Sequence, residues 1–158
     1  MIFSEVKNII VSQGDIKKIN LTDGTILYEY VESLVCNPVV GISLSRHTTS
    51  DEFSVIRVVY TISGISNSLI TSCGVVWILK ARLGSKTLTI DTPGRSIVHS
   101  SPGTNSDTVN GIEKSYNLRY NTTKSKYAIR AYVTYKDLSG STVTTYSNQV
   151  EASYDSLA

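Results

Sequence analysis

The segment KYAIRAYVTYKDLSGSTVTTYSNQV, residues 126–150, contains two strand-like stretches separated by turn residues. Residues 128–135 are mostly apolar, β-branched or aromatic, and such side chains fit a pleated, half-buried surface. The turn Asp137-Leu138-Ser139-Gly140 follows, and Gly accepts backbone conformations that other residues resist. Residues 143–150 supply the second strand-like stretch. The segment therefore predicts a β-hairpin near the end of the chain.

The rest of the chain upstream of this hairpin shows the same kind of pattern. No segment has a capped apolar stripe of helical period, so we expect little or no helix. Turn signals separate the strand-like segments about every 8–12 residues, which is typical of an antiparallel sandwich. The run at 73–79 is apolar almost throughout and predicts a central strand covered on both faces. Further strands are expected at residues 40–45, 53–62, 87–90, 96–99 and 112–120.

Composition narrows the classes of function. The chain has 158 residues, 41% hydrophobic and 18% charged, which is enough apolar material for a core. The net charge of +2 is too small to indicate a nucleic-acid partner. No signal peptide and no apolar run of membrane-spanning length is visible, so we expect synthesis in the cytoplasm and no membrane partner. Cys36 and Cys73 are expected to be free thiols.

The first 31 residues form short apolar runs that differ from the rest of the chain. Asp23-Gly24 between two such runs is a hairpin signal. We expect a small N-terminal β-unit at residues 1–31 and a sandwich at residues 32–158. A lone hairpin is marginally stable in water, so this unit must pack on its own sandwich, on a copy of itself or on another protein. The candidate docking residues are Val6, Ile9, Ile16, Ile19, Ile26 and Tyr28.

The sequence contains none of the common catalytic motifs, and we expect no enzyme, no cofactor and no metal. Gly-x-Ser-x-Gly, a phosphate-binding Gly loop and His-Glu-x-x-His are absent. His47 and His99 each stand beside hydroxyl residues, but such neighbours are expected by chance in a chain rich in Ser and Thr. Asp51-Glu52 is the only adjacent carboxylate pair that could do acid–base work, and a solvated turn explains it.

Tyrosines are abundant in the C-terminal half of the chain, and two interpretations are open. They form a sugar- or protein-binding face, since Tyr supplies rigid amphipathic contact area. Alternatively, some fill the core and the others cover strand surfaces. The residues concerned are Tyr116, Tyr120, Tyr127, Tyr132, Tyr135, Tyr146 and Tyr154.

Residues 126–135, Gly140 and residues 146–150 together resemble the last two strands of fibronectin-type-III-like and immunoglobulin-like modules. The resemblance implies an all-β, immunoglobulin-like or fibronectin type III-like antiparallel sandwich. It also implies that Tyr127 occupies the tyrosine corner, with its hydroxyl bonded to upstream backbone, and that Trp77 is the inner tryptophan of a middle strand. The cysteine pair of antibody domains is missing. Because these modules host many functions, the resemblance concerns the fold more than the role.

The N-terminal segment is similar to short β-units of tailed-bacteriophage virion proteins, through Val6-Lys7-Asn8-Ile9 and Gly24-Thr25-Ile26-Leu27-Tyr28. This resemblance implies a non-enzymatic virion protein that decorates or joins the head, neck or tail. Its partners would be capsid, neck or tail subunits, bound in multiple copies or as a homo-oligomer. The alternative is a host-adhesion or carbohydrate-binding module that uses loops such as residues 100–110 to bind a host surface glycan.

Overall fold

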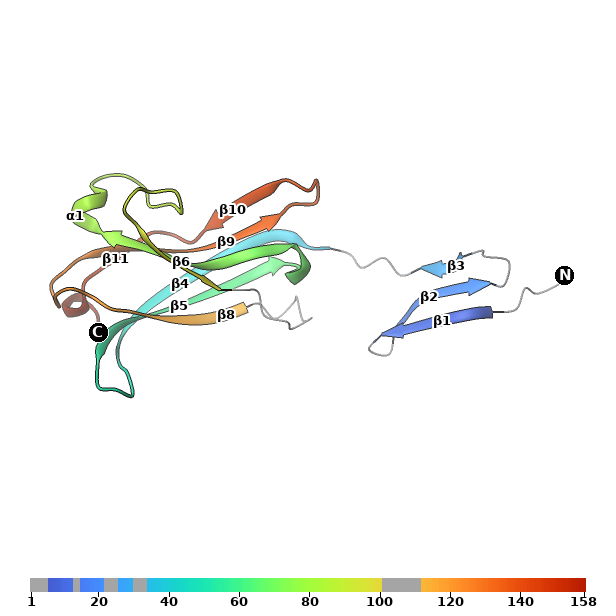
Figure 1. Ribbon diagram of the computed structural model, residues 1–158, viewed down its shortest axis with the longest axis horizontal. Helices are drawn as coiled ribbons and strands as arrows, with labels where there is room; N and C mark the ends of the chain where they lie inside the picture. The colour runs from blue at the N-terminus through green and yellow to red at the C-terminus, as the bar shows by residue number, and fades with distance from the viewer. Residues whose placement is uncertain (1–5, 13–14, 22–25, 30–33, 101–111) are drawn as a thin grey trace. The chain divides into compact units, whose positions relative to one another are not determined.

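A computed structural model describes residues 6–12, 15–21, 26–29, 34–100 and 112–158 (Figure 1). The chain divides into two compact units, Met1–Ser33 and Leu34–Ala158. The sequence predicts this boundary after residue 31, two residues earlier. We call these two parts the N-terminal unit and the sandwich.

The N-terminal unit is a three-stranded antiparallel sheet in the order β1-β2-β3. Its strands are β1 (Val6–Ser12), β2 (Asp15–Leu21) and β3 (Ile26–Glu29). These are the apolar runs that predicted short strands. The predicted turn at Asp23-Gly24 lies outside the described residues, but β2 and β3 pair in the antiparallel sense that such a turn produces.

The sandwich consists of two antiparallel sheets (Figure 1). One sheet has the order β4-β5-β8, and the other has the order β10-β9-β6-β7 with β11 also paired to β9. The all-β antiparallel sandwich that the sequence predicts is confirmed. The strands of the first sheet are β4 (Cys36–Thr48), β5 (Ser54–Ile65) and β8 (Ile112–Leu118). Those of the second are β6 (Ile70–Leu79), β7 (Ser96–Ser100), β9 (Tyr127–Lys136), β10 (Thr142–Tyr146) and β11 (Val150–Ala152).

The strand order of the sandwich can be compared with that of immunoglobulin-like and fibronectin type III-like modules. In the usual lettering β4, β5 and β8 correspond to strands A, B and E, while β6, β7, β9 and β10 correspond to C, C′, F and G. The hairpin predicted from residues 126–150 is therefore the F–G hairpin, in which Thr142–Tyr146 pairs with residues 132–136. Trp77 lies on β6, the C strand, where the resemblance placed it.

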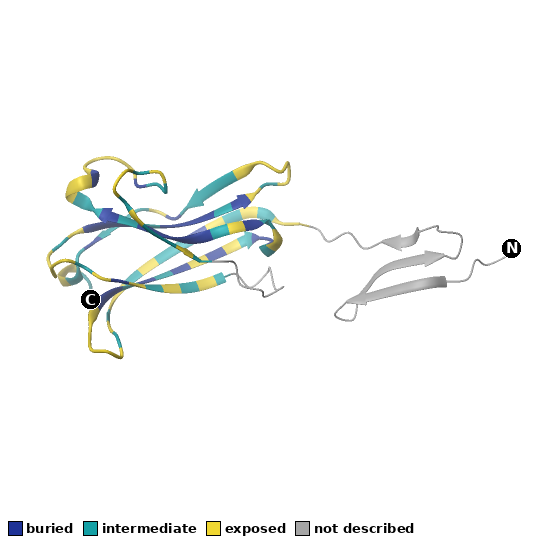
Figure 2. Cartoon of the chain, viewed as in Figure 1, coloured by how far each residue is buried: buried dark blue, intermediate teal, exposed yellow. Residues whose placement is uncertain are grey.

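The main core lies between the facing sides of the two sheets, and residues of β5, β6 and β9 dominate it (Figure 2). Burial alternates along β5 and β8, because one face of their sheet contacts solvent. It is nearly continuous along β6 and β9, so both faces of these strands are covered. The prediction of a doubly covered central strand at residues 73–79 is confirmed.

A second, smaller core covers the other face of β6 and β9. It contains Val76, Ile78 and Ala128 of these strands, together with Leu83 and Leu88 from the connection between β6 and β7. The prediction of a strand at residues 87–90 is wrong. Leu88 is fully buried, which explains the apolar alternation, but its backbone bonds to side chains and not to a neighbouring strand.

One further prediction needs correction in its boundaries, and the expectation of little helix holds. The predicted last strand at 143–150 is two strands, β10 and β11, separated at residues 147–149. The break lies at Ser147. Its side-chain hydroxyl, and not a backbone carbonyl of the neighbouring strand, accepts a 3.0 Å hydrogen bond from the N–H of Ala131. Helical structure in the described residues is limited to single turns at Asn67–Leu69, Lys80–Leu83 (α1) and Tyr154–Ser156, as the sequence predicts.

Candidate functional site

The candidate docking residues all lie on the three strands of the N-terminal unit. The register places Ile9 opposite Ile19 and Ile19 opposite Tyr28, so these three residues form one row across the sheet. Residues directly opposite each other on an antiparallel sheet share a face. Val6 stands opposite Leu21, Ile16 opposite Val11, and Ile26 opposite Asn20, each beside a register shift.

Tyr127 occupies the tyrosine corner that the resemblance implies. Its side chain is buried, and its hydroxyl accepts a 3.0 Å hydrogen bond from the backbone N–H of Asn121, six residues upstream. This bond joins the first residue of β9 to the connection that follows β8. Trp77 is half-buried against the main core, and its ring centroid lies 5.1 Å from that of Tyr116 on β8.

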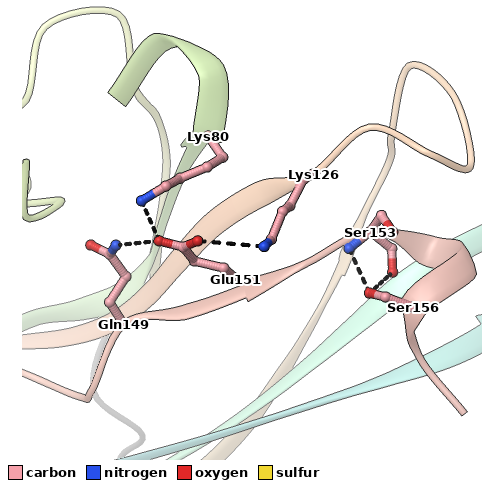
Figure 3. A network of polar contacts seen from close by, with 6 residues as sticks. All are labelled: Lys80, Lys126, Gln149, Glu151, Ser153 and Ser156. Carbon is pink, nitrogen blue, oxygen red and sulfur yellow. Dashed lines mark hydrogen bonds and ion pairs between the residues drawn. The ribbon is translucent and has the colours of Figure 1, made fainter. Parts of the chain in front are cut away.

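A network of charged and amide groups ties three segments together at one end of the sandwich (Figure 3). The carboxylate of Glu151 on β11 accepts a hydrogen bond from Lys80 at the start of α1, and another from the Gln149 amide at 3.1 Å. Lys126 lies 3.7 Å from the other carboxylate oxygen. The hydrogen bond from Lys80 is the main cause that lowers the pKa of Glu151. Each of the four groups has a partner within the network, which points to a structural role.

Arg130 holds the β6–β7 connection on the outer face of its sheet. Its guanidinium donates 2.9 Å hydrogen bonds to the carbonyls of Leu88 and Ser147, and it lies 4.4 Å over the ring of Tyr146. The Leu88 N–H donates to the side-chain oxygen of Gln149 at 2.9 Å. Burial lowers the pKa of Arg130, but the side chain stays cationic because an arginine titrates far above neutral pH.

Most of the tyrosines that could form a binding face are structural. Tyr127, Tyr132 and Tyr135 are buried, and Tyr116, Tyr120 and Tyr154 are half-buried and pack against the main core. Tyr146 is half-buried beneath Arg130. The interpretation in which tyrosines fill the core and cover strand surfaces therefore describes this sandwich.

The two histidines are far from a catalytic arrangement within the described residues. His99 is exposed on β7, and its Nδ1 forms a hydrogen bond with the hydroxyl of Tyr132, not with a serine. His47 is half-buried on β4 and has no hydrogen-bond partner in the described part of the chain. Asp51 and Glu52 are exposed in the turn between β4 and β5, as expected for a solvated turn.

Both cysteines are free thiols, as the sequence predicts. Cys73 is fully buried, and its Sγ lies 3.4 Å from the carbonyl oxygen of Ser100 and 3.9 Å from the hydroxyl of Tyr60. Burial raises the pKa values of the Cys73 thiol and the Tyr60 hydroxyl, and it raises that of Tyr132 to about 12. These groups therefore stay protonated and neutral near neutral pH.

A cleft at one end of the sandwich is not indicated by any sequence pattern. It is bounded by Trp77 and Tyr127 and by two arginines, Arg82 and Arg119, which are far apart in the sequence. No motif connects these positions, because the fold alone brings α1 and the end of β8 to the same place.

Within the residues that the structure describes, no three His, Cys, Asp or Glu side chains are grouped in a way that could hold a metal ion. The described helices are all too short or too polar to cross a membrane. Comparisons with protein-family models, curated proteins and solved structures found no match.

Proposed function

We propose that the chain is a non-enzymatic structural protein of a tailed-bacteriophage virion, attached to the particle through its N-terminal unit and displaying the sandwich. The attachment site on the particle is a head, neck or tail subunit present in repeated copies. Many equivalent weak contacts on one particle give strong overall attachment without catalysis.

The observation that carries this proposal is the small size of a separate N-terminal unit. It spans 33 residues and contains a single three-stranded sheet. Domains below about 40 residues usually need disulfides, a metal or association with another chain. The first 33 residues contain neither Cys nor His, which favours association with another protein as the source of stability.

The row formed by Ile9, Ile19 and Tyr28 supports the same proposal. A three-stranded sheet becomes stable when it has an apolar face that is covered. These three residues stand opposite one another on the three strands, so they supply one contiguous apolar row for a partner. The resemblance of this segment to β-units of phage virion proteins is the reason for proposing that the partner is another virion subunit.

The test is incorporation of variants into virions of the phage that encodes the chain. Copies per purified particle are counted by quantitative mass spectrometry for the full chain, for Ile19→Asp, and for Leu138→Asp. Leu138 is 66% exposed in the β9–β10 turn, so Leu138→Asp is a matched change outside the proposed docking row. We expect Ile19→Asp to be lost from particles and Leu138→Asp to be retained.

Two results contradict the proposal. One is the absence of the full chain from purified particles. The other is normal incorporation of both Ile19→Asp and a variant that lacks residues 1–33. Circular dichroism of each purified variant establishes that the sandwich is folded, so that a loss of incorporation is not a loss of folding.

A further inference from the structure

The cleft beside Trp77 has the size of a small-ligand site. Its volume is about 310 Å³, at the lower end of the range for ligand pockets, and it therefore suits a single ring. Both sheets contribute to it, since β6, β7 and β9 belong to one and Arg119 follows the last strand of the other. The lining residues used below are Trp77, Arg82, Ser96, Arg119, Asn121 and Tyr127.

The charge of the cleft is positive and uncompensated. Arg82 is exposed and has no hydrogen bond or ion pair with any described residue. The guanidinium of Arg119 lies 5.2 Å over the ring of Phe53, a contact that orients it and leaves its N–H donors available. No Asp or Glu belongs to the described lining of the cleft. Two guanidinium groups without a carboxylate favour an anionic ligand, and their planar donors suit a carboxylate.

The remaining lining groups suit a ring that carries hydroxyls. Trp77 is half-buried and lines the cleft, where its indole supplies an aromatic group. The hydroxyl of Tyr127 accepts from the N–H of Asn121 and keeps its own proton for donation. The side chains of Ser96 and Asn121 are exposed and have no hydrogen-bond partner in the described part of the chain. A few polar groups around an aromatic surface are typical of small-molecule sites.

We propose that this cleft binds one acidic sugar residue, with its carboxylate between Arg82 and Arg119 and its ring against Trp77. The inference concerns the sandwich alone and stands whether or not the N-terminal unit attaches to a virion. A nucleic-acid strand is a poorer fit, because single-strand binding uses an extended basic groove that follows the backbone past several bases.

Trp77 supplies the measurement, because it is the only tryptophan of the chain. Its fluorescence in the full chain is followed during titration with methyl β-glucuronide and with methyl β-glucoside, which differ in one carboxylate. We expect a saturable change with the glucuronide and at least about tenfold weaker binding of the glucoside, since hydrogen bonds to charged groups contribute that much.

Three variants test whether the change in Trp77 fluorescence comes from binding in the cleft. We expect Arg82→Gln and Arg119→Gln each to weaken glucuronide binding about tenfold. Arg57→Gln is the matched control, because Arg57 lies on β5 outside the cleft. Its binding curve should equal that of the unchanged protein. Because both cleft arginines are exposed, their removal should leave the thermal unfolding curve unchanged.

Several outcomes overturn the proposal. A glucoside that binds as tightly as the glucuronide excludes the carboxylate contact, and the absence of any saturable response excludes the site. An equal loss in Arg57→Gln means that the response is general electrostatic attraction. Inorganic phosphate that binds as tightly as the glucuronide means that the cleft recognises an anion and not a sugar. None of these results bears on incorporation into virions.

Discussion

The hydroxyl of Tyr127 accepts a 3.0 Å hydrogen bond from the backbone N–H of Asn121, and this bond fixes the connection between the two sheets at the start of β9. We expect Tyr127→Phe to lower the free energy of unfolding by about 1 kcal/mol, the usual contribution of one hydrogen bond. Urea denaturation measures the change. The sandwich remains folded, because the ring of Phe fills the same buried space.

Tyr135→Phe is the control for this substitution. Tyr135 is also a buried tyrosine of β9, but its hydroxyl lies 3.4 Å from the Thr145 hydroxyl, a longer contact between two side chains. We expect a smaller loss of stability than for Tyr127→Phe. An equal loss in both variants would show that the backbone bond at Asn121 has no special importance.

Close approach of β7 to β6 leaves no room for a side chain at Gly74. A Cβ at this position would stand 1.9 Å from the carbonyl oxygen of Val98 and 3.1 Å from the hydroxyl of Tyr132. Since Val98 is bonded into the same sheet, the backbone has to move. We expect Gly74→Ala to destabilise the sandwich by about 3 kcal/mol or more, the upper end for overpacking, measured by urea denaturation.

Gly41→Ala offers a comparison in which the obstacle is a side chain. A Cβ at Gly41 would stand 2.6 Å from the hydroxyl oxygen of Thr61, which is exposed and free to rotate. We therefore expect a loss well below that of Gly74→Ala. Equal losses in the two variants would contradict the assignment of the effect to the fixed carbonyl of Val98.

Sequence patterns predict most of the sandwich and little of its cleft. The period-two alternation in β5 and β8 survives in the fold because one face of each strand contacts solvent. The alternation around Leu88 has another origin, since side chains of Arg130 and Gln149 hold that backbone. These partners are distant in sequence, and no local pattern reveals them.

Candidate functional residues are also hard to predict when their partners are distant in sequence. Tyr127 could be assigned from a resemblance because the corner is a local feature of one strand and its preceding connection. Arg82 and Arg119 come together through the pairing of distant strands, and each looks like an ordinary surface arginine in the sequence. In the N-terminal unit the sequence predicts which positions are apolar, but not that Ile9, Ile19 and Tyr28 form one row. Register shifts between the strands decide which residues stand opposite one another.

Acid should remove the contribution that the network around Glu151 makes to the stability of the fold. Its pKa is lower in the folded protein than in the unfolded chain, chiefly through the hydrogen bond from Lys80. The interaction therefore stabilises the fold above the unfolded pKa of about 4.3 and is lost as the pH falls through the folded pKa. We expect Glu151→Gln to lower the melting temperature at neutral pH, and the difference from the unchanged protein to vanish in acid.

Glu113→Gln is the control for this pH series. Glu113 is exposed on β8 and has no ion pair within the described residues, so its replacement should shift the melting temperature little at any pH. A difference between Glu151→Gln and the unchanged protein that persists into acid would mean that the carboxylate charge is not the cause.

The thiols of Cys36 and Cys73 should differ in their reactivity in the folded protein. Cys73 is fully buried and burial raises the pKa of its thiol, so the reactive thiolate is scarce and inaccessible in the folded protein. Cys36 is half-buried at the start of β4, the edge strand of its sheet. With a chromogenic disulfide reagent we expect one thiol to react in the native protein and both in urea. Cys36→Ser should abolish the native reaction and keep one thiol in urea. Two equally fast thiols in the native protein would instead mean that β6 and β7 separate readily, because Cys73 lies opposite Ser100 in that pairing.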